Sequence, residues 1–293
     1  MIAEQRETWL LRARRTKAST WLEVFIVSNL AFLGIDIFIA HQANAFARRE
    51  EWLPIVFSVA AATLLTPALF STGYCARSRG LSVVLGAGAV LLGVLGMLLH
   101  LRSVFFERQT LQALVYTAPF VAPLAYVGVG LLLLLNRLER RDSPYWARWV
   151  VLLAWGGFAG NFGLSLLDHA QNGFFLGTEW LSVVGAAFGT SFLLSVVLWP
   201  GDPRLRRVCA WLMLGEALLG VLGFAFHVYA DVYTRPGATL HDRVIYGAPP
   251  FAPLLFSNLA LLASLGLWSL ANVGRALGSG GSGTKGRTPS LLE

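Results

Sequence analysis

The sequence predicts an all-α polytopic membrane protein whose eight transmembrane helices form two tandem parallel four-helix repeats, with both termini in the cytoplasm. Three observations lead to this prediction. The chain is 56% hydrophobic and only 13% charged, whereas soluble domains carry about 25% charged residues. Apolar runs recur along it, each close to the roughly 20 residues that a helix needs to cross the hydrocarbon core. Finally, two long stretches of the sequence repeat one another.

Eight apolar runs are long enough to span a bilayer. The strands of a membrane barrel would be about 10 residues long and would alternate in polarity, unlike these runs. The predicted spans are therefore helices, at residues 21–40, 52–70, 81–101, 113–135, 149–167, 180–199, 208–230 and 246–270.

Lys and Arg are divided unequally between the connecting segments, and this division sets the orientation in the membrane. The N-terminal segment and every second connection after it are rich in arginine. The other connections hold only Arg48, Arg49, Arg102, Arg108, Arg235 and Arg243. We therefore expect a multi-pass plasma (inner) membrane protein with both termini inside. The net charge of +7 lies in short clusters between apolar runs, which favours the lipid bilayer as partner and argues against nucleic acid.

The repeat appears when the chain is aligned with itself. At an offset of 128 residues the pattern H-x2-N-x-F-x4-E-W-L, which begins at His41, recurs from His169. At an offset of 127 the hexapeptide LLGVLG at 91–96 recurs at 218–223, and His100 falls on His227. Four spans per copy is an even number, so both copies run in the same direction through the membrane.

This repeat divides the chain into five parts. They are a basic cytoplasmic segment at 1–20, a first repeat at 21–136, a cytoplasmic linker at 137–148, a second repeat at 149–270, and a disordered cytoplasmic tail at 271–293. The motif A-P-x-x-A-P occurs at 118–123 and at 248–253. We expect its prolines to kink the fourth and eighth spans, because proline removes a helical hydrogen bond.

The histidines end the odd-numbered spans and therefore share one depth at the outer membrane face. Imidazole together with carboxylate suits a first-row transition metal, and two facing imidazoles suit the iron of haem b. The predicted metal ligands are His41, His100, His169, His227, Glu51 and Glu179. The residues expected to support these ligands or to handle protons are Asp36, Asn44, Glu107, Asp168, Asn172, Asp231 and His241.

Glycines lie on the same helix faces as the histidines, because they precede a histidine by four or seven residues. These are Gly34, Gly93, Gly96, Gly220 and Gly223. A glycine face accommodates either a porphyrin or a neighbouring helix. Two four-helix halves with a histidine pair each also resemble the plan of the haem A synthases, in architecture alone.

Three functions fit this pattern. The leading hypothesis is a protein that binds a transition metal or haem at its outer face, a redox enzyme being one such protein. The second is a transporter or channel without a prosthetic group, in which the same residues handle solute or protons. The third is a structural or assembly subunit that binds other membrane subunits. The sequence lacks a P-loop, a GxSxG motif and an HExxH motif, which argues against ATP-driven transport and serine hydrolysis.

Overall fold

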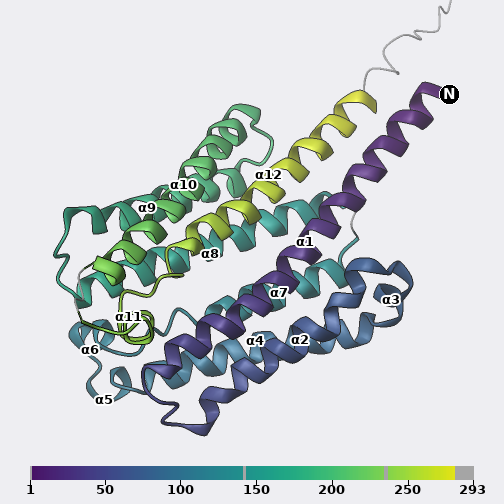
Figure 1. Cartoon of the computed structure of the whole chain (residues 1–293). Helices are drawn as coiled ribbons and strands as arrows, with labels where there is room; N and C mark the ends of the chain where they lie inside the picture. The colour runs from purple at the N-terminus through teal and green to yellow at the C-terminus, as the bar shows by residue number, and fades with distance from the viewer. Residues whose placement is uncertain (1, 141–142, 234–236, 281–293) are drawn as a thin grey trace, which may run out of the picture.

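A computed structural model describes residues 2–140, 143–233 and 237–280, and every regular element in these ranges is a helix (Figure 1). Seven helical segments of the described chain are long and apolar enough to cross a membrane. The prediction of an all-helical chain is therefore confirmed, and the fold is that of a polytopic helical membrane protein in its coarse outline.

Eight longer helices follow one another along the chain, with short elements between them. The longer helices are α1 (Ile2–Gln42), α2 (Trp52–Phe70), α4 (Arg79–Leu101), α7 (Leu124–Leu138), α8 (Pro144–Gln171), α9 (Trp180–Leu198), α10 (Pro203–Tyr233) and α12 (Leu254–Gly280). The short ones are η1 (Arg49–Glu51), α3 (Thr72–Arg77), α5 (Phe105–Arg108), α6 (Leu111–Val115), η2 (Gly177–Glu179) and α11 (Leu240–Tyr246).

Two of the predicted spans begin later than expected, both at the A-P-x-x-A-P motif. α6 ends at Val115 and α7 begins only at Leu124, with Pro123 as its N-cap. Proline lacks the N–H that a helix needs and disfavours the helical conformation in the residue before it. The prolines therefore precede α7 and α12 instead of kinking them, and the expected kinks are wrong. With 15 residues, α7 is shorter than the roughly 20 of a typical span, so the eighth span stays a prediction.

Near both ends of the chain the helices extend beyond the predicted spans. Residues 2–20 form the first part of α1. α12 extends to Gly280, which makes the first part of the predicted disordered tail helical. The remainder of that tail, 281–293, lies outside the described residues.

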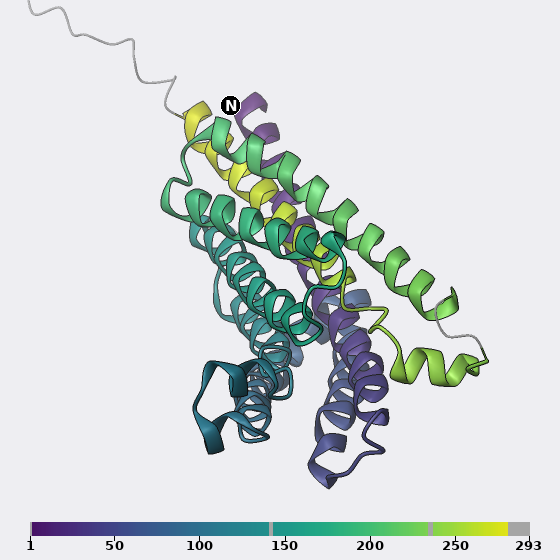
Figure 2. The same ribbon diagram turned by 90° about the vertical axis from the view of Figure 1, so that its left-hand side faces the viewer.

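The long helices form a first group (α1, α2, α4 and α7) and a second group (α8, α9, α10 and α12). The two groups meet along α1, α7, α8 and α12. α1 contacts α2, α7 and α12, whereas α8 contacts α7, α9 and α12. α1 and α12 run side by side and antiparallel in both views (Figures 1 and 2). α9 packs closely along α10, but α2 makes little contact with α4. The first group is therefore more open than the second.

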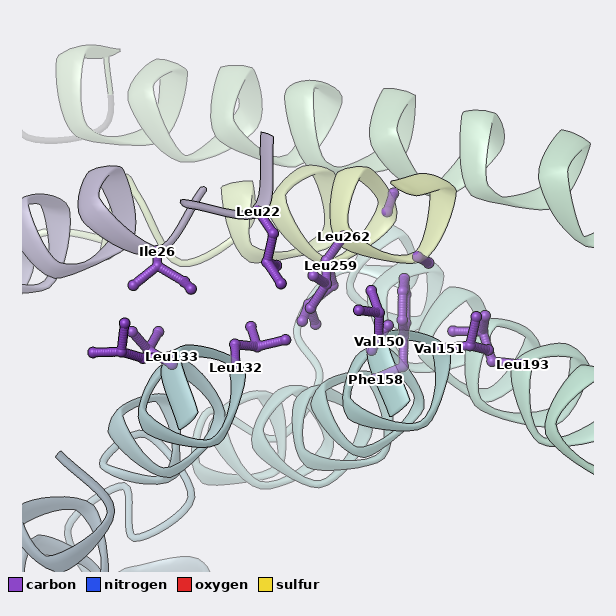
Figure 3. Packing of buried hydrophobic residues seen from close by; sticks show 14 of the residues in the cluster. Leu22, Ile26, Leu132, Leu133, Val150, Val151, Phe158, Leu193, Leu259 and Leu262 are labelled. Carbon is purple, nitrogen blue, oxygen red and sulfur yellow. The ribbon is translucent and has the colours of Figure 1, made fainter. Parts of the chain in front are cut away.

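The buried core joins both groups. Figure 3 shows leucine, isoleucine, valine and phenylalanine side chains from α1, α7, α8, α9 and α12 converging between the helices. The outward faces are also apolar: Val84 on α4 is 68% exposed and Leu218 on α10 is 63% exposed. Apolar surface on this scale is unfavourable in water, and a bilayer would cover it.

Candidate functional site

The four predicted histidine ligands lie at one end of the bundle, where α5, α6 and α11 gather opposite the N-terminus (Figure 1). His41, His100 and His169 occupy the last turns of α1, α4 and α8. His227 lies within α10, before the end of that helix at Tyr233. The structure brings these side chains together as one pair in each half.

In the first pair, the rings of His41 and His100 meet edge to face with their centroids 6.3 Å apart. Nδ1 of His41 lies 3.0 Å from the carbonyl oxygen of Ile37, and Nδ1 of His100 lies 2.9 Å from that of Pro119. A carbonyl only accepts hydrogen bonds, so Nδ1 is the protonated nitrogen of each neutral ring. Nε2 is then the nitrogen that can bind a metal or a proton.

The second pair is His169 and His227. Nδ1 of His227 lies 2.8 Å from the carbonyl oxygen of Pro249, which repeats the contact between His100 and Pro119. His169 interacts electrostatically with both Glu179 and His227, and its Nδ1 lies 3.6 Å from Oε2 of Glu179. Each pair thus combines one ring fixed by a proline carbonyl with a second ring from the neighbouring span.

Each pair also has a carboxylate with an unsatisfied oxygen. Glu51 interacts electrostatically with His100, as Glu179 does with His169. Oε2 of Glu51 and Oε2 of Glu179 are both buried, and neither has a hydrogen-bond partner within the described structure. A buried polar atom without a partner is destabilising by about 1–3 kcal/mol. A cation or a proton at this position would remove that penalty.

A tight turn after His41 and after His169 places these carboxylates. The amides of Phe46 and Phe174 donate to the carbonyl oxygens of His41 and His169, at 3.2 and 3.1 Å. Both phenylalanines have a positive φ of 51°, which is uncommon for residues other than glycine. Phe46 stacks on Trp52 at 4.3 Å and Phe174 on Trp180 at 4.2 Å. The motif H-x2-N-x-F-x4-E-W therefore encodes a turn that returns the glutamate toward the histidine.

Asn44 and Asn172 contribute to the same turn. Their backbone amides donate to the carbonyl oxygens of His41 and His169, at 3.1 and 3.2 Å. Nδ2 of Asn172 also lies 3.4 Å from the carbonyl oxygen of Asp168. These contacts shape the turn around each histidine, and no contact joins either amide side chain to an imidazole in the described part of the chain.

Neighbouring helices occupy the predicted glycine faces. A Cβ atom on Gly93 would lie 2.8 Å from the carbonyl oxygen of Pro123, and one on Gly220 would lie 2.9 Å from that of Pro253. Gly96 and Gly223 pack on the same two proline rings, and Gly34 faces Ser58 of α2. The LLGVLG and A-P-x-x-A-P motifs are therefore packing partners of each other. Sequence spacing alone left both a neighbouring helix and a porphyrin open as the occupant of these faces.

The other predicted residues have more varied surroundings. Asp231 is 6% exposed, and its Oδ1 accepts a hydrogen bond from the amide of Ala248 at 2.7 Å. Asp36 and Asp168 are half-buried on α1 and α8. Glu107 and His241 are exposed, and the structure does not bring either into a histidine pair.

The loop between α10 and α12 is organised around α11. The Thr239 hydroxyl donates to the Asp242 carboxylate at 2.7 Å and forms a capping box with it. That hydrogen bond holds the pKa of Asp242 below its usual value. The helical part of this loop packs beside α1 and α10.

An open depression of about 760 Å³ lies beside the first pair. Its lining residues are Arg48, Glu50, Arg102, Ser103, Phe106 and Glu107. Ser103 borders the histidine directly, because its hydroxyl donates to the carbonyl oxygen of His100 at 2.6 Å. Sequence reasoning used Arg48 and Arg102 only to orient the chain and missed them as neighbours of the site.

Two buried carboxylates lie away from the histidines. Glu23 of α1 accepts hydrogen bonds from Asn136 at 2.8 Å and from Nη1 of Arg137 at 2.7 Å, both on α7. Arg137 was expected in the cytoplasmic linker, but it is only 7% exposed. Glu216 of α10 is 3% exposed, and its Oε2 lacks a hydrogen-bond partner among the described residues.

Beyond these pairs, the described structure does not gather further side chains of the types that bind metals. Among the described residues, no group of three or more His, Cys, Asp or Glu side chains is arranged to hold a metal ion. Cys75 and Cys209 are free thiols. The site is therefore an imidazole pair with a nearby carboxylate, not a closed ligand cage.

Comparisons with known protein families, with curated proteins and with solved structures give no match to this chain. The fold and the site therefore define only a class: a helical membrane protein that gathers histidine pairs at one end of its bundle.

Proposed function

We propose that this protein binds a first-row transition-metal ion at each histidine pair, on the outer face of the plasma (inner) membrane. His41, His100 and Glu51 would serve one site, and His169, His227 and Glu179 the other. The observation that carries the proposal is the pairing of His41 with His100, whose Nδ1 atoms both face backbone carbonyls.

The spacing of the first pair is compatible with a shared metal. Metal–nitrogen bonds of about 2.0–2.1 Å would hold two imidazole centroids roughly 5–6.5 Å apart, depending on the angle at the metal. The observed separation is 6.3 Å. This value lies at the upper end of the range and corresponds to a wide angle at the metal, so a tetrahedral site would require the two rings to move closer together.

The hydrogen bonds of the rings also support metal binding. Histidine ligands usually donate their second ring N–H to a carbonyl or carboxylate, which fixes the tautomer and orients the ring. His41, His100 and His227 make this contact with Ile37, Pro119 and Pro249. Two imidazoles with one carboxylate form a ligand set that zinc and non-haem iron accept.

A metal ion fits the surroundings better than haem b does. A porphyrin along the predicted glycine faces would need the space that Pro123 of the first half and Pro253 of the second already fill. A single ion needs only the ring nitrogens and the unsatisfied oxygen of Glu51 or Glu179. Haem b remains the alternative cofactor, and its absorption bands distinguish it.

The proposal includes the full topology of eight spans in two parallel repeats, with both termini in the cytoplasm. Matching local contacts in the two halves support it. The His100–Pro119 contact corresponds to His227–Pro249, and stacking of Phe46 on Trp52 corresponds to that of Phe174 on Trp180. Opposite orientations of the halves would place the two histidine pairs on different membrane faces.

A transporter without a prosthetic group is the second candidate. The charged depression beside the first pair, with Arg48, Glu50, Arg102 and Glu107 in its lining, favours it. A polar cavity of that kind offers a solute both cations and carboxylates. Uptake into proteoliposomes that persists after chelation would support this function over metal binding.

The test is to purify the protein in detergent, measure its metal content and record its absorption spectrum. We expect bound transition metal without haem bands, and normal metal content in His241→Ala, because His241 is exposed on α11. Protein that holds neither metal nor haem after exposure to zinc, copper, iron and haem would refute the proposal.

A further inference from the structure

Glu216 is buried by the helix packing, and no cationic side chain pairs with it in the described structure. It is 3% exposed, and Oε2 lacks a hydrogen-bond partner among the described residues. The side chain points toward α9, since a Cβ atom on Gly185 would lie 3.0 Å from Oε2. An ionised carboxylate is strongly disfavoured in such surroundings, so the group is neutral unless a cation reaches it.

No cation lies beside Glu216 on the two long helices that pack on α10. α9 and α12 carry no titratable side chain within 180–198 and 254–272. The short helix α11 also contacts α10 and carries His241, Asp242 and Arg243, but Arg243 meets α10 at the carbonyl oxygen of Val232, far along the helix from Glu216. On α10 itself the nearest titratable groups of the same face are Cys209 and His227. Among the other buried charged groups described, Glu23 pairs with Arg137, and Asp231 accepts the Ala248 amide. The second half therefore buries a lone acid.

One face of α10 runs from this acid toward the outer face. Glu216, Gly220, Gly223 and His227 follow one another at spacings of four, three and four residues, so they share that face. Pro253 and Ser257 fill the space over the two glycines, so α10 itself offers no polar side chain between the acid and the histidine. Glu216 lies about 16 Å along the helix from His227, at 1.5 Å per residue.

α8 contributes a polar face to the same bundle. Asn161, Ser165 and His169 are spaced four residues apart on it, and the first two are buried. Phe158 of α8 packs on Gly189 of α9. Gly189 lies one helical turn inward from Gly185, which faces Glu216. Asn161 lies one turn outward from Phe158, which places it at the level of Glu216. Nδ2 of Asn161 also lacks a hydrogen-bond partner in the described structure.

The first half has no such polar face. The residues that align with Asn161, Ser165 and Glu216 are Leu33, Ile37 and Ala89. Ala89 is 2% exposed, so this position is buried in both halves but is acidic only in the second. If the buried acid served both proposed metal sites in the same way, the first half would carry an acid at the matching position as well.

We propose that Glu216 is a proton-binding site inside the second half, which holds a proton as a neutral carboxylic acid and exchanges it with the outer face past Asn161 and Ser165 toward His169 and His227. The ligand of this site is the proton, and it is independent of the metal proposed above. The first half, with Ala89, binds no proton at the matching position.

Dicyclohexylcarbodiimide tests the bound proton, because this apolar reagent reacts with protonated carboxyl groups. The acid adds across one C=N bond: the proton goes to nitrogen, the carboxyl oxygen goes to carbon, and rearrangement leaves a stable acylurea without a leaving group. Glu23 is the matched control in the same molecule, since it is 5% exposed but paired with Arg137. Mass spectrometry of metal-free wild-type protein should find the label on Glu216 and not on Glu23. A label on both, or an unlabelled Glu216, would overturn the proposal.

Infrared spectroscopy in deuterated buffer tests the exchange. The carbonyl stretch of a protonated carboxyl should shift on deuteration and should be lost in Glu216→Gln. In the variant Asn161→Leu/Ser165→Ala the shift should slow markedly, whereas Leu33→Asn/Ile37→Ser in the first half should leave its rate unchanged. A band that survives in Glu216→Gln, or an exchange rate that the α8 substitutions leave unaltered, would contradict the proposed path.

Discussion

The imidazoles of His41 and His100 lie edge to face with centroids 6.3 Å apart, although they belong to different long helices, α1 and α4. Backbone carbonyls anchor Nδ1 of both rings, so the orientation of each ring is set before any ligand arrives. Prior orientation of this kind lowers the entropic penalty of binding. The pair can therefore act as a preformed half of a ligand set.

Metal binding should weaken as the pH falls, because an imidazole must be neutral to bind a metal and protons compete for the same nitrogen. Isothermal titration with zinc between pH 5.5 and 8 measures this. An affinity that does not change across that range would exclude imidazole ligands.

Removal of one partner from the buried pair of Glu23 and Arg137 should destabilise the protein by about 3–5 kcal/mol, because the other charge is left buried alone. Glu23→Met/Arg137→Met replaces both charges by apolar groups and should be considerably more stable than Arg137→Met alone. Unfolding of the detergent-purified variants, followed by circular dichroism, measures both. Equal stability of the single and double variants would show that the two charges do not depend on each other.

Gly220→Ala should destabilise the protein by about 1–3 kcal/mol, since a Cβ atom there overpacks the contact between α10 and α12. The nearest atoms would be Ser257 Oγ, the amide nitrogen of Ser257 at 2.8 Å and the carbonyl oxygen of Pro253 at 2.9 Å. Gly215→Ala on the same helix is the control, because nothing lies within 4 Å of its Cβ position. A similar loss of stability in both variants would mean that helix propensity, not packing, explains the effect.

Cysteine labelling tests whether α7 crosses the membrane. With eight spans, Ala43→Cys and Gly177→Cys should both react with a membrane-impermeant maleimide in intact cells, in a Cys75→Ser/Cys209→Ser background. Gly201→Cys should react only after permeabilisation. All three positions are exposed. Labelling of Ala43→Cys from outside and of Gly177→Cys only from inside would show that α7 does not span.

Hydropathy predicted the long apolar helices of this fold. The predicted span at 52–70 coincides with α2, and that at 180–199 exceeds α9 by one residue. The length of the apolar run determines where each of these two helices begins and ends, so the sequence alone was sufficient to predict their bounds. The late start of α7 and α12 was missed because Pro119 and Pro249 were interpreted as kinks. Their carbonyls instead accept hydrogen bonds from His100 and His227, a tertiary contact that spacing does not reveal.

The grouping of the histidines could be inferred from their common place at the ends of odd spans. The pairing of Glu23 with Arg137 could not, because it depends on how α1 packs against α7. The same holds for Glu216, whose burial follows from its position against Gly185 of α9. Both residues are ionisable groups within apolar segments, which was the only signal that the sequence offered.

Metal stoichiometry in paired variants tests the central claim most directly. The account predicts two ions per wild-type chain, one in His41→Ala/His100→Ala, one in His169→Ala/His227→Ala, none in the quadruple variant and two in His241→Ala. Each variant should be compared after equal loading and desalting, by elemental analysis. A quadruple variant that retains the wild-type metal content, or a wild-type protein that retains no metal, would contradict the account.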